Sequence, residues 1–298
     1  MPAISETIAR RPLAGTRINH AHRLSYGLVG CWPLNETAGY TANDATGRNN
    51  GSLVGLDPGA WNSTNLQASA FRSASGPLTG LRWHLQASEY LTIPSSPLYD
   101  GPVGTIVFWM RTRQGFSSVN PLLLARHDAS LSSNGLSSYL SSANAFASLQ
   151  LKTSGGTARL SISGSVSLDD DREHLIGLQF SQISGATGAV WVDGRLAASG
   201  TNSGAWAFAS QEVRFGLGLD AFWNIFGGAA GNIRWYNRTL SADEHRELYL
   251  NPYAGFAEDD YGALTIPAGG GGGIGGSGSI FASPIFNSRV VRGRGLTH

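Results

Sequence analysis

Paired carboxylates that could cleave a glycosidic bond are the first chemistry to look for in this sequence. Such a pair faces across one cleft at about 5 to 9.5 Å. In a β-sandwich the two acids often project from alternating positions of one strand, as in ExDxxE, and no such string occurs here. Asp169, Asp170 and Asp171 are consecutive, so their side chains point to opposite sides, and the run is predicted to be a solvated turn. We therefore expect no catalytic residues, although a glycoside hydrolase stays open as a third reading.

The histidine, cysteine and serine residues do not form a catalytic or metal-binding motif. His20 and His22 are the only close pair of histidines, and no third ligand lies near them, so a polar contact is expected there rather than a metal. Cys31 is the single cysteine and sits in an apolar run, which predicts a buried, inert thiol. No GxSxG motif stands between a strand and a helix. The sequence therefore predicts no cofactor.

Aromatic side chains in polar loops could stack on sugars. Three tryptophans lie in loops rich in Gly, Asn and Ser, and one of them has an adjacent amide; the predicted glycan-binding residues are Trp61, Trp206, Trp223 and Asn224. The alternative is that these indoles close the ends of a sandwich. Four other tryptophans fall within apolar runs and are expected in the core: Trp32, Trp109, Trp191 and Trp235.

The two ends of the chain carry residues suited to holding other chains. Residues 1–26 are polar and basic, and residues 256–278 form an acidic and then glycine-rich linker. Residues 279–298 are apolar and basic, and they are too few to form a core of their own. We expect both ends to dock on neighbouring subunits, with assembly contacts from Arg10, Arg11, Arg17, Ile280, Phe281, Ile285, Phe286, Arg289, Arg292 and Arg294.

Composition narrows the class of protein further. The chain has 298 residues, of which only 14% are charged and 40 are glycine, and this favours short strands and tight turns over long surface helices. A net charge of +1 and sparse arginines predict no nucleic-acid partner. No run of 18 apolar residues occurs, and residues 1–9 lack the apolar stretch of a signal peptide, so we expect synthesis in the cytoplasm and no membrane contact.

The elements that must position these residues are mostly strands. About a dozen short apolar or alternating runs separated by Gly, Asn and Ser predict an all-β antiparallel sandwich. The runs are 27–34, 90–93, 104–112, 122–126, 146–152, 158–162, 175–180, 188–192, 195–197, 213–216 and 232–236. Within this list, residues 105–110 form a continuous β-rich apolar stretch bounded by glycine and charge, which indicates a strand buried on both faces. A capping box at Ser241 and Glu244 predicts one late helix that ends before Pro252.

Several of these segments resemble laminin-G-type, concanavalin-A-like lectin/glucanase jelly rolls. The resemblance is carried in order by six blocks: 28–36 (LVGCWPLNE), 44–51 (DATGRNNG), 90–94 (YLTIP), 105–110 (TIVFWM), 191–194 (WVDG) and 233–244 (IRWYNRTLSADE). It implies one jelly-roll domain over residues 27–255. Acidic positions that such domains often have are replaced by 83–86 (WHLQ) and by Gly231 and Asn232, so the calcium site of some relatives is disfavoured here.

The chain ends around this domain add a looser resemblance. Residues 18–32 and 248–253 look like laminin-G-type proteins encoded by tailed phages and prophages. That resemblance implies a non-enzymatic virion surface protein, such as a capsid decoration or cement protein. Its expected partners are other virion proteins, such as a major capsid protein, and further copies of itself. The alternative is a carbohydrate-binding adhesin of a tail or fibre, which would bind host or environmental glycans.

Overall fold

The computed structural model describes residues 12, 15–36, 39–55, 81–83, 90–112, 121–127, 135–141, 145–153, 156–208, 212–216 and 228–257, with the backbone alone for residues 81–83 and 127. The chain divides into two units, Met1–Asp259 and Asp260–His298. The second unit lies outside the described residues, and with it the predicted docking tail.

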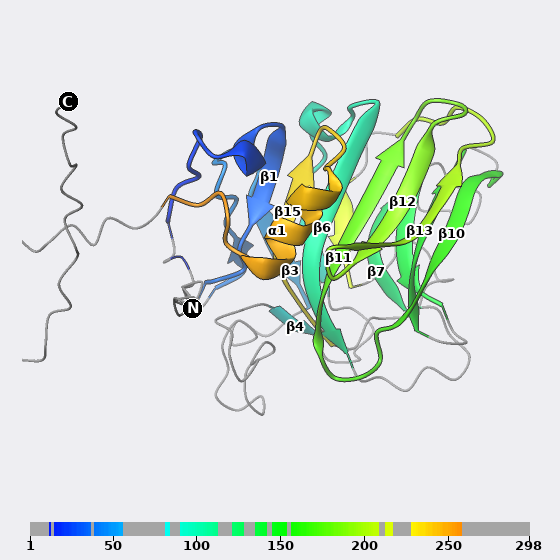
Figure 1. Ribbon diagram of the computed structural model, residues 1–298. Helices are drawn as coiled ribbons and strands as arrows, with labels where there is room; N and C mark the ends of the chain where they lie inside the picture. The colour runs from blue at the N-terminus through cyan, green and yellow to red at the C-terminus, as the bar shows by residue number, and fades with distance from the viewer. Residues whose placement is uncertain are drawn as a thin grey trace, which may run out of the picture. The chain divides into compact units, whose positions relative to one another are not determined.

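The described body is a sandwich of two antiparallel sheets (Figure 1), as the sequence predicts. The seven-stranded sheet contains, in spatial order, β1 (Leu28–Trp32), β15 (Gly228–Tyr236), β6 (Val103–Thr112), β11 (Glu173–Ser181), β12 (Thr187–Val192) and β13 (Arg195–Thr201), with β4 (Leu81–Trp83) beside β15. The eight-stranded sheet contains β10 (Ala158–Ser167), β9 (Phe146–Lys152), β8 (Gly135–Leu140), β7 (Leu122–His127), β14 (Val213–Phe215), β5 (Tyr90–Ile93), β3 (Gly51–Val54) and β2 (Thr41–Ala42). Three short helical segments complete the described elements: η1 (Arg23–Ser25), η2 (Pro97–Tyr99) and α1 (Ala242–Leu250).

The main core lies between the two sheets, and alternation along the strands fills it. In β5, Leu91 and Ile93 are fully buried while Tyr90 and Thr92 face outward and are half-buried. The core contains the predicted tryptophans Trp32 and Trp235. The hairpin predicted at Asp193 and Gly194 is present between β12 and β13, and both residues have the positive φ that a tight two-residue turn requires.

A second apolar cluster covers the outer face of the seven-stranded sheet. Helix α1 lies across β15, β6 and β11 in Figure 1, which is why β6 is buried on both faces, as predicted. The ring of Tyr249 on α1 stacks on that of Trp109 with centroids 5.9 Å apart. The predicted capping box is formed, because Ser241 and Glu244 bond each other's backbone N–H groups. The eight-stranded sheet has no helix on its outer face among the described residues.

Residues 15–26 of the predicted N-terminal arm are described and pack on the body. Ile18 and Leu24 are 7% and 0% exposed and belong to the cluster beneath α1. Ile18 forms a β-bridge with Phe256, and the Asn19 N–H donates to the Gly255 carbonyl at 2.9 Å. Residues 15–26, predicted as part of an arm, therefore contribute Ile18 and Leu24 to the second apolar cluster of the body.

Candidate functional site

A row of small polar side chains crosses the outer face of the eight-stranded sheet. Strand pairing places one residue from each strand in register with the next, and the row reads Thr41, Ser52, Thr92, Arg214, Ala125, Ser137, Gln150 and Ser161. All but one of its members can form hydrogen bonds through the side chain. We call this row and its neighbouring outward side chains the polar face.

The centre of the polar face is organised by an ion pair between Glu212 and Arg214, at the start of the central strand β14. Glu212 accepts hydrogen bonds from Arg214 Nε at 2.6 Å and, through its other oxygen, from the Thr92 hydroxyl at 2.8 Å. The guanidinium of Arg214 lies 4.4 Å from the centre of the Tyr90 ring. Because all four side chains are held by one another, their positions are set before any ligand arrives.

A second line of outward residues runs beside the first on the strands β8, β9 and β10. Tyr139 pairs with Ser148, and Ser148 pairs with Ser163, whose hydroxyl oxygen lies 2.7 Å from the Ser148 hydroxyl oxygen. The Tyr139 ring is half-buried and packs against Leu122 and Ala125. The polar face therefore carries a tyrosine on each side of Arg214, with hydroxyl and amide groups around them.

The polar face is almost neutral, and its exposure changes along the row. Thr41, Ser52 and Ser161 at the two edges are exposed, Thr92, Arg214 and Gln150 are half-buried, and Ala125 and Ser137 near the middle are 0% and 6% exposed. Such a surface can offer hydrogen bonds and an aromatic ring without a strong electrostatic field. That chemistry suits an uncharged, hydroxyl-rich ligand better than a phosphate or a basic peptide.

The residues predicted to bind glycans do not lie on this face. Trp206 is 5% exposed, its Nε1 donates to the Ser181 carbonyl at 2.6 Å, and it packs edge-on against Phe180 and Phe208. With no ring face free, Trp206 does not fit the predicted role of stacking on a sugar. Instead it closes one end of the sandwich, which is the alternative drawn from the sequence. Trp61, Trp223 and Asn224 lie outside the described residues.

The predicted assembly contacts fall mostly outside the described part of the chain. This holds for Arg10, Arg11, Ile280, Phe281, Ile285, Phe286, Arg289, Arg292 and Arg294. Arg17 is described and exposed, but its carbonyl accepts a hydrogen bond from the Ala257 N–H at 2.8 Å. The backbone at Arg17 is therefore part of the body.

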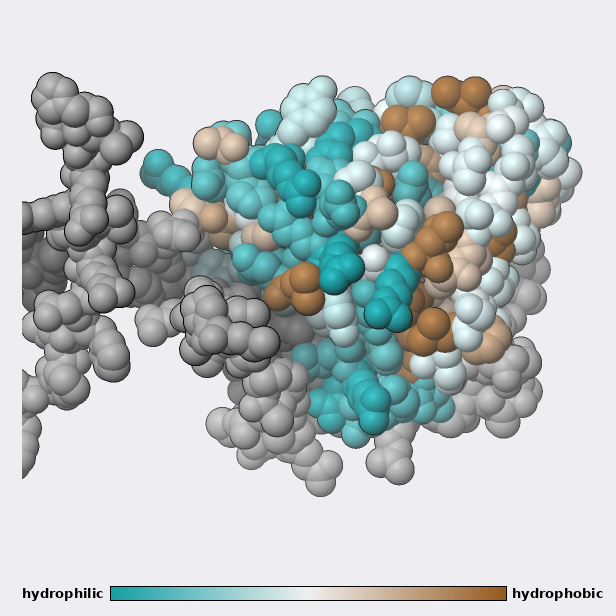
Figure 2. Space-filling model, viewed as in Figure 1, coloured by the Kyte–Doolittle hydropathy of each residue, from teal (hydrophilic) through white to brown (hydrophobic). Residues whose placement is uncertain are grey.

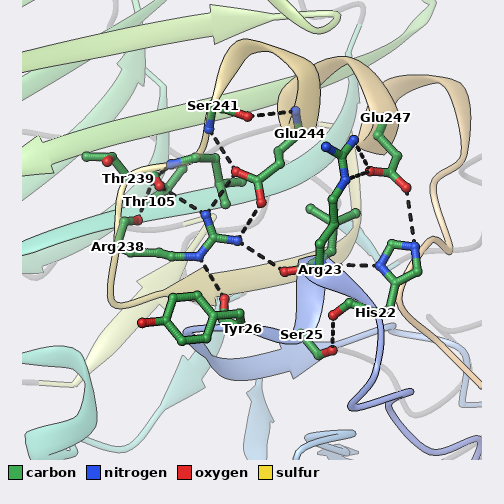
Figure 3. Close-up of polar contacts among 12 residues, drawn as sticks. His22, Arg23, Ser25, Tyr26, Thr105, Arg238, Thr239, Ser241, Glu244 and Glu247 are labelled. Atoms are coloured by element: carbon green, nitrogen blue, oxygen red, sulfur yellow. Dashed lines mark hydrogen bonds and ion pairs between the residues drawn. The ribbon is translucent and has the colours of Figure 1, made fainter.

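A polar clamp fixes the N-terminal segment to α1 (Figure 3). The guanidinium of Arg238 donates to both oxygens of Glu244, at 2.9 and 2.7 Å, and to the Tyr26 carbonyl at 2.8 Å. Arg23 and His22 both contact Glu247, at 2.6 and 3.3 Å. Burial raises the pKa of Glu244, but its bonds to Arg238 and Ser241 outweigh burial and lower the pKa to about 2. His22 thus makes the polar contact expected of it.

The acidic run at 169–171 lies in a turn, and two of its members are paired. Asp170 contacts His174 Nε2 at 3.1 Å, and Asp171 accepts from Arg111 Nε at 2.8 Å. His174 Nδ1 also lies 2.8 Å from an oxygen of Asp193. Burial lowers the pKa of His174, but the two aspartates outweigh it, so the net pKa is raised. Because its two ring nitrogens contact the carboxylates of Asp193 and Asp170, His174 connects the turns that contain these two residues.

The turn at residues 44–51, which resembles the acidic turn of laminin-G-type domains, is held together by hydrogen bonds to Asp44. Asp44 accepts five hydrogen bonds, including the N–H groups of Cys31 and Thr46 at 2.9 Å and that of Asn49 at 3.0 Å. Across the described ranges, no group of three or more His, Cys, Asp or Glu side chains is arranged to hold a metal ion. Cys31 is buried beneath this turn, and burial raises the pKa of its thiol to about 12.

Fold and sequence together define the class: this is a lectin-like β-sandwich. A family model described as Concanavalin A-like lectin/glucanases superfamily (Laminin_G_3) matches residues 85–244, more than half of the chain. The protein therefore belongs to this family. No curated protein matches the chain. The described part of the chain contains no helix long and apolar enough to cross a membrane.

Solved structures with a similar fold include receptor-binding domains of toxins. The binding domain of Paraclostridial Mosquitocidal Protein 1 matches with a TM-score of 0.56 and 13% identity, over 75% of this chain and 52% of that one. The binding domain of Botulinum Neurotoxin DC in complex with SialylT matches with a TM-score of 0.54 and 12% identity, over 75% of this chain and 50% of that one. A structure described by the words that cell entry of botulinum neurotoxin type C is dependent upon interaction with two ganglioside molecules matches with a TM-score of 0.52 and 12% identity, over 75% of this chain and 50% of that one. The chain spans about half the length of these structures, and such low identity shows the fold alone.

Sequence reasoning missed the polar face, although part of its signal was present. The alternation at 90–93 assigns Tyr90 and Thr92 to the face opposite Leu91 and Ile93. The same alternation places Arg214 outward between Val213 and Phe215. That β5 and β14 are neighbours follows only from the sheet order, because about 120 residues separate Thr92 from Glu212 in the chain.

Proposed function

We propose that this protein is a carbohydrate-binding domain that takes its ligand on the polar face. The observation that carries the proposal is the polar row, which runs in register across all eight strands of a sheet whose outer face has no helix among the described residues. Within the concanavalin-A-like lectin family, such a row gives this chain a surface suited to sugar hydroxyl groups.

The length of the row indicates the kind of carbohydrate. Neighbouring strands lie about 4.8 Å apart, so a row across eight strands spans roughly 34 Å. One strand spacing is about the length of one pyranose unit, so successive sugars of an extended chain would meet successive strands on either side of the buried Ala125 and Ser137. We infer that the ligand is a linear polysaccharide bound across the strands, with Tyr90 and Arg214 near the middle of its path.

The comparisons support a receptor- or glycan-binding role in a general way. Two of the similar toxin domains are described as bound to SialylT or dependent on ganglioside molecules. Those ligands belong to those proteins, and the present chain shares only their fold. The specific support comes from the prearranged Tyr90, Arg214 and Glu212 side chains described above.

The experiment is a binding screen on the full chain with central and remote variants. Arg214→Gln and Tyr90→Ala should each weaken binding to a linear polysaccharide by about tenfold or more, because a hydrogen bond to a charged group contributes about 1.5–3 kcal/mol. The matched control is Arg195→Gln, which removes an exposed arginine from β13 in the other sheet. Binding is measured on glycan arrays and by affinity electrophoresis. The absence of binding, or equal binding by all variants, would refute the proposal.

We propose that binding occurs without hydrolysis. Glycoside hydrolysis uses two carboxyl groups, one of which must give or take a proton. Glu212 is bonded through both oxygens, to Thr92 and Arg214, and this holds it as a positioning group. The check is the release of reducing ends from a bound polysaccharide during long incubation. Release by the wild type and by Arg195→Gln, but not by Glu212→Gln, would revive the hydrolase reading.

A second proposal keeps the expected role in a virion. The described body has its own two cores, and the chain divides at Asp259 and Asp260 before the glycine-rich and apolar–basic segments. We propose that residues 279–298 dock on other virion proteins, such as a major capsid protein, and hold the body at a virion surface. Deletion of residues 269–298 should leave a folded body that no longer joins particles. Particles that incorporate the truncated protein normally would refute this role.

A further inference from the structure

Strand β10 forms one edge of the eight-stranded sheet and has a strictly alternating sequence there. From 161 to 167 the chain reads Ser-Ile-Ser-Gly-Ser-Val-Ser, so every second residue is serine. All four serines are exposed, and the run contains no charged residue. The segment is one continuous strand of ten residues, Ala158–Ser167, paired on one side with β9.

An edge strand of this kind is open to pairing with another chain. Natural sheets protect their edges with charged side chains, proline, bulges or very short strands. The opposite edge of the same sheet, β2, is only two residues long. The neighbouring edge of the other sheet, β13, begins with Arg195 and has a register shift against β12. Within 161–167 of β10 the side chains offer no such charge or proline, although the pairing with β9 becomes irregular after Ser163.

The charges near β10 lie beyond the two ends of the serine run, at Arg159 before it and at Asp169 and Asp170 after it. Figure 1 places β10 at the side of the molecule away from α1 and the N-terminal segment. Figure 2 shows hydrophilic residues gathered over the α1 side, whereas the side of β12, β13 and β10 is pale to brown. Two large apolar side chains are exposed on these strands, Val166 at 40% and Leu196 at 53%. Residues 161–167 themselves carry no charge that would oppose the approach of an identical segment.

We propose that β10 pairs antiparallel with β10 of a second copy of this chain, giving a two-fold symmetric dimer. The alternating run is complementary to itself, because antiparallel pairing sets serines opposite serines on one face. With Gly164 at the two-fold axis, Ile162 of one copy lies opposite Val166 of the other on the second face. The eight-stranded sheets of the two copies then become one continuous sheet.

This dimer would also extend the polar face. Ser161 lies at this edge, so the polar face would continue onto the second copy, with the two polar rows offset from each other along the strand direction. Two linked faces would hold one long polysaccharide with higher avidity. This consequence rests on the proposed function, whereas the dimer itself does not.

The test is the mass of the full chain measured by sedimentation equilibrium over a range of concentrations. We expect a monomer–dimer equilibrium, and Ser165→Lys or Ser165→Glu should each raise its dissociation constant by roughly tenfold, because with Gly164 at the two-fold axis the two introduced like charges lie diagonally across the pair, about 7–8 Å apart. An equal mixture of the two variants should restore dimers, which also shows that both variants fold. The matched control, Thr41→Lys, adds the same charge at the opposite edge of the same sheet and should leave dimerisation unchanged.

Each other outcome overturns the proposal. A wild-type chain that stays monomeric up to its solubility limit has no such interface. A dimer that is insensitive to both Ser165 variants uses another surface, and one lost only on deletion of residues 269–298 uses the tail. Because this readout involves no sugar, failure to bind polysaccharide leaves its result intact.

Discussion

Acid should destabilise this protein through one buried histidine on α1. His245 is 1% exposed, its ring is stacked on that of Trp191 at 4.4 Å, and its Nε2 is buried without a hydrogen-bond partner. Burial lowers the pKa of His245 to about 4, and the nearby charge of Glu244 only partly opposes this. The neutral ring fits the site, and the protonated ring does not.

The magnitude follows from the difference between the folded and unfolded pKa values. An unfolded histidine takes up its proton near pH 6.5, whereas His245 in the folded protein remains neutral until about pH 4. Between these values the unfolded state binds more protons, so the free energy of unfolding decreases as the pH falls. Each pKa unit corresponds to about 1.4 kcal/mol, and the full window gives a loss of roughly 3 kcal/mol.

The assay is urea unfolding of the wild type and His245→Phe at neutral pH and near pH 4.5. Phenylalanine keeps a flat ring against Trp191 but cannot take up a proton. Its extra bulk beside Gly177 lowers stability at both pH values, so that cost cancels in the difference between them. We expect the wild type to lose about 2–3 kcal/mol more than the variant on acidification. Equal losses in the two proteins would refute the reasoning.

Three further predictions concern the polar contacts. His174 has its pKa raised by Asp193 and Asp170, so its stabilising contribution is complete below pH 6.5 and is lost as the pH rises through its folded pKa; His174→Gln should remove that decline in urea titrations above pH 6.5. Cys31 should resist iodoacetamide in the native protein and react only on unfolding, since its pKa is about 12; rapid labelling under native conditions would contradict its burial. EDTA should leave both melting temperature and polysaccharide binding unchanged, because Asp44 is already occupied by five hydrogen bonds; a shift restored by calcium would show a metal site.

The sequence by itself determined the sandwich and much of its strand content. Period-two alternation and turn residues located β5, β12 and the hairpin at Asp193 because these patterns act over a few residues. The capping box at Ser241 located the start of α1 for the same reason. Strand β8 (Gly135–Leu140) escaped prediction, since a short run with two serines carries little local signal.

Only the tertiary structure decided which distant residues meet. Ile18 and Leu24 lie in a polar, basic stretch, and their burial depends on the surface made by α1 and residues 251–257. Trp206 occurs in a loop-like sequence, yet its indole closes the sandwich because Phe180 and the Ser181 carbonyl are brought beneath it. Likewise, alternation assigns Thr92 and Arg214 to an outward face, but only the order of strands in the sheet places them side by side. Sheet order is set by contacts between segments far apart in the chain, and no local pattern encodes them.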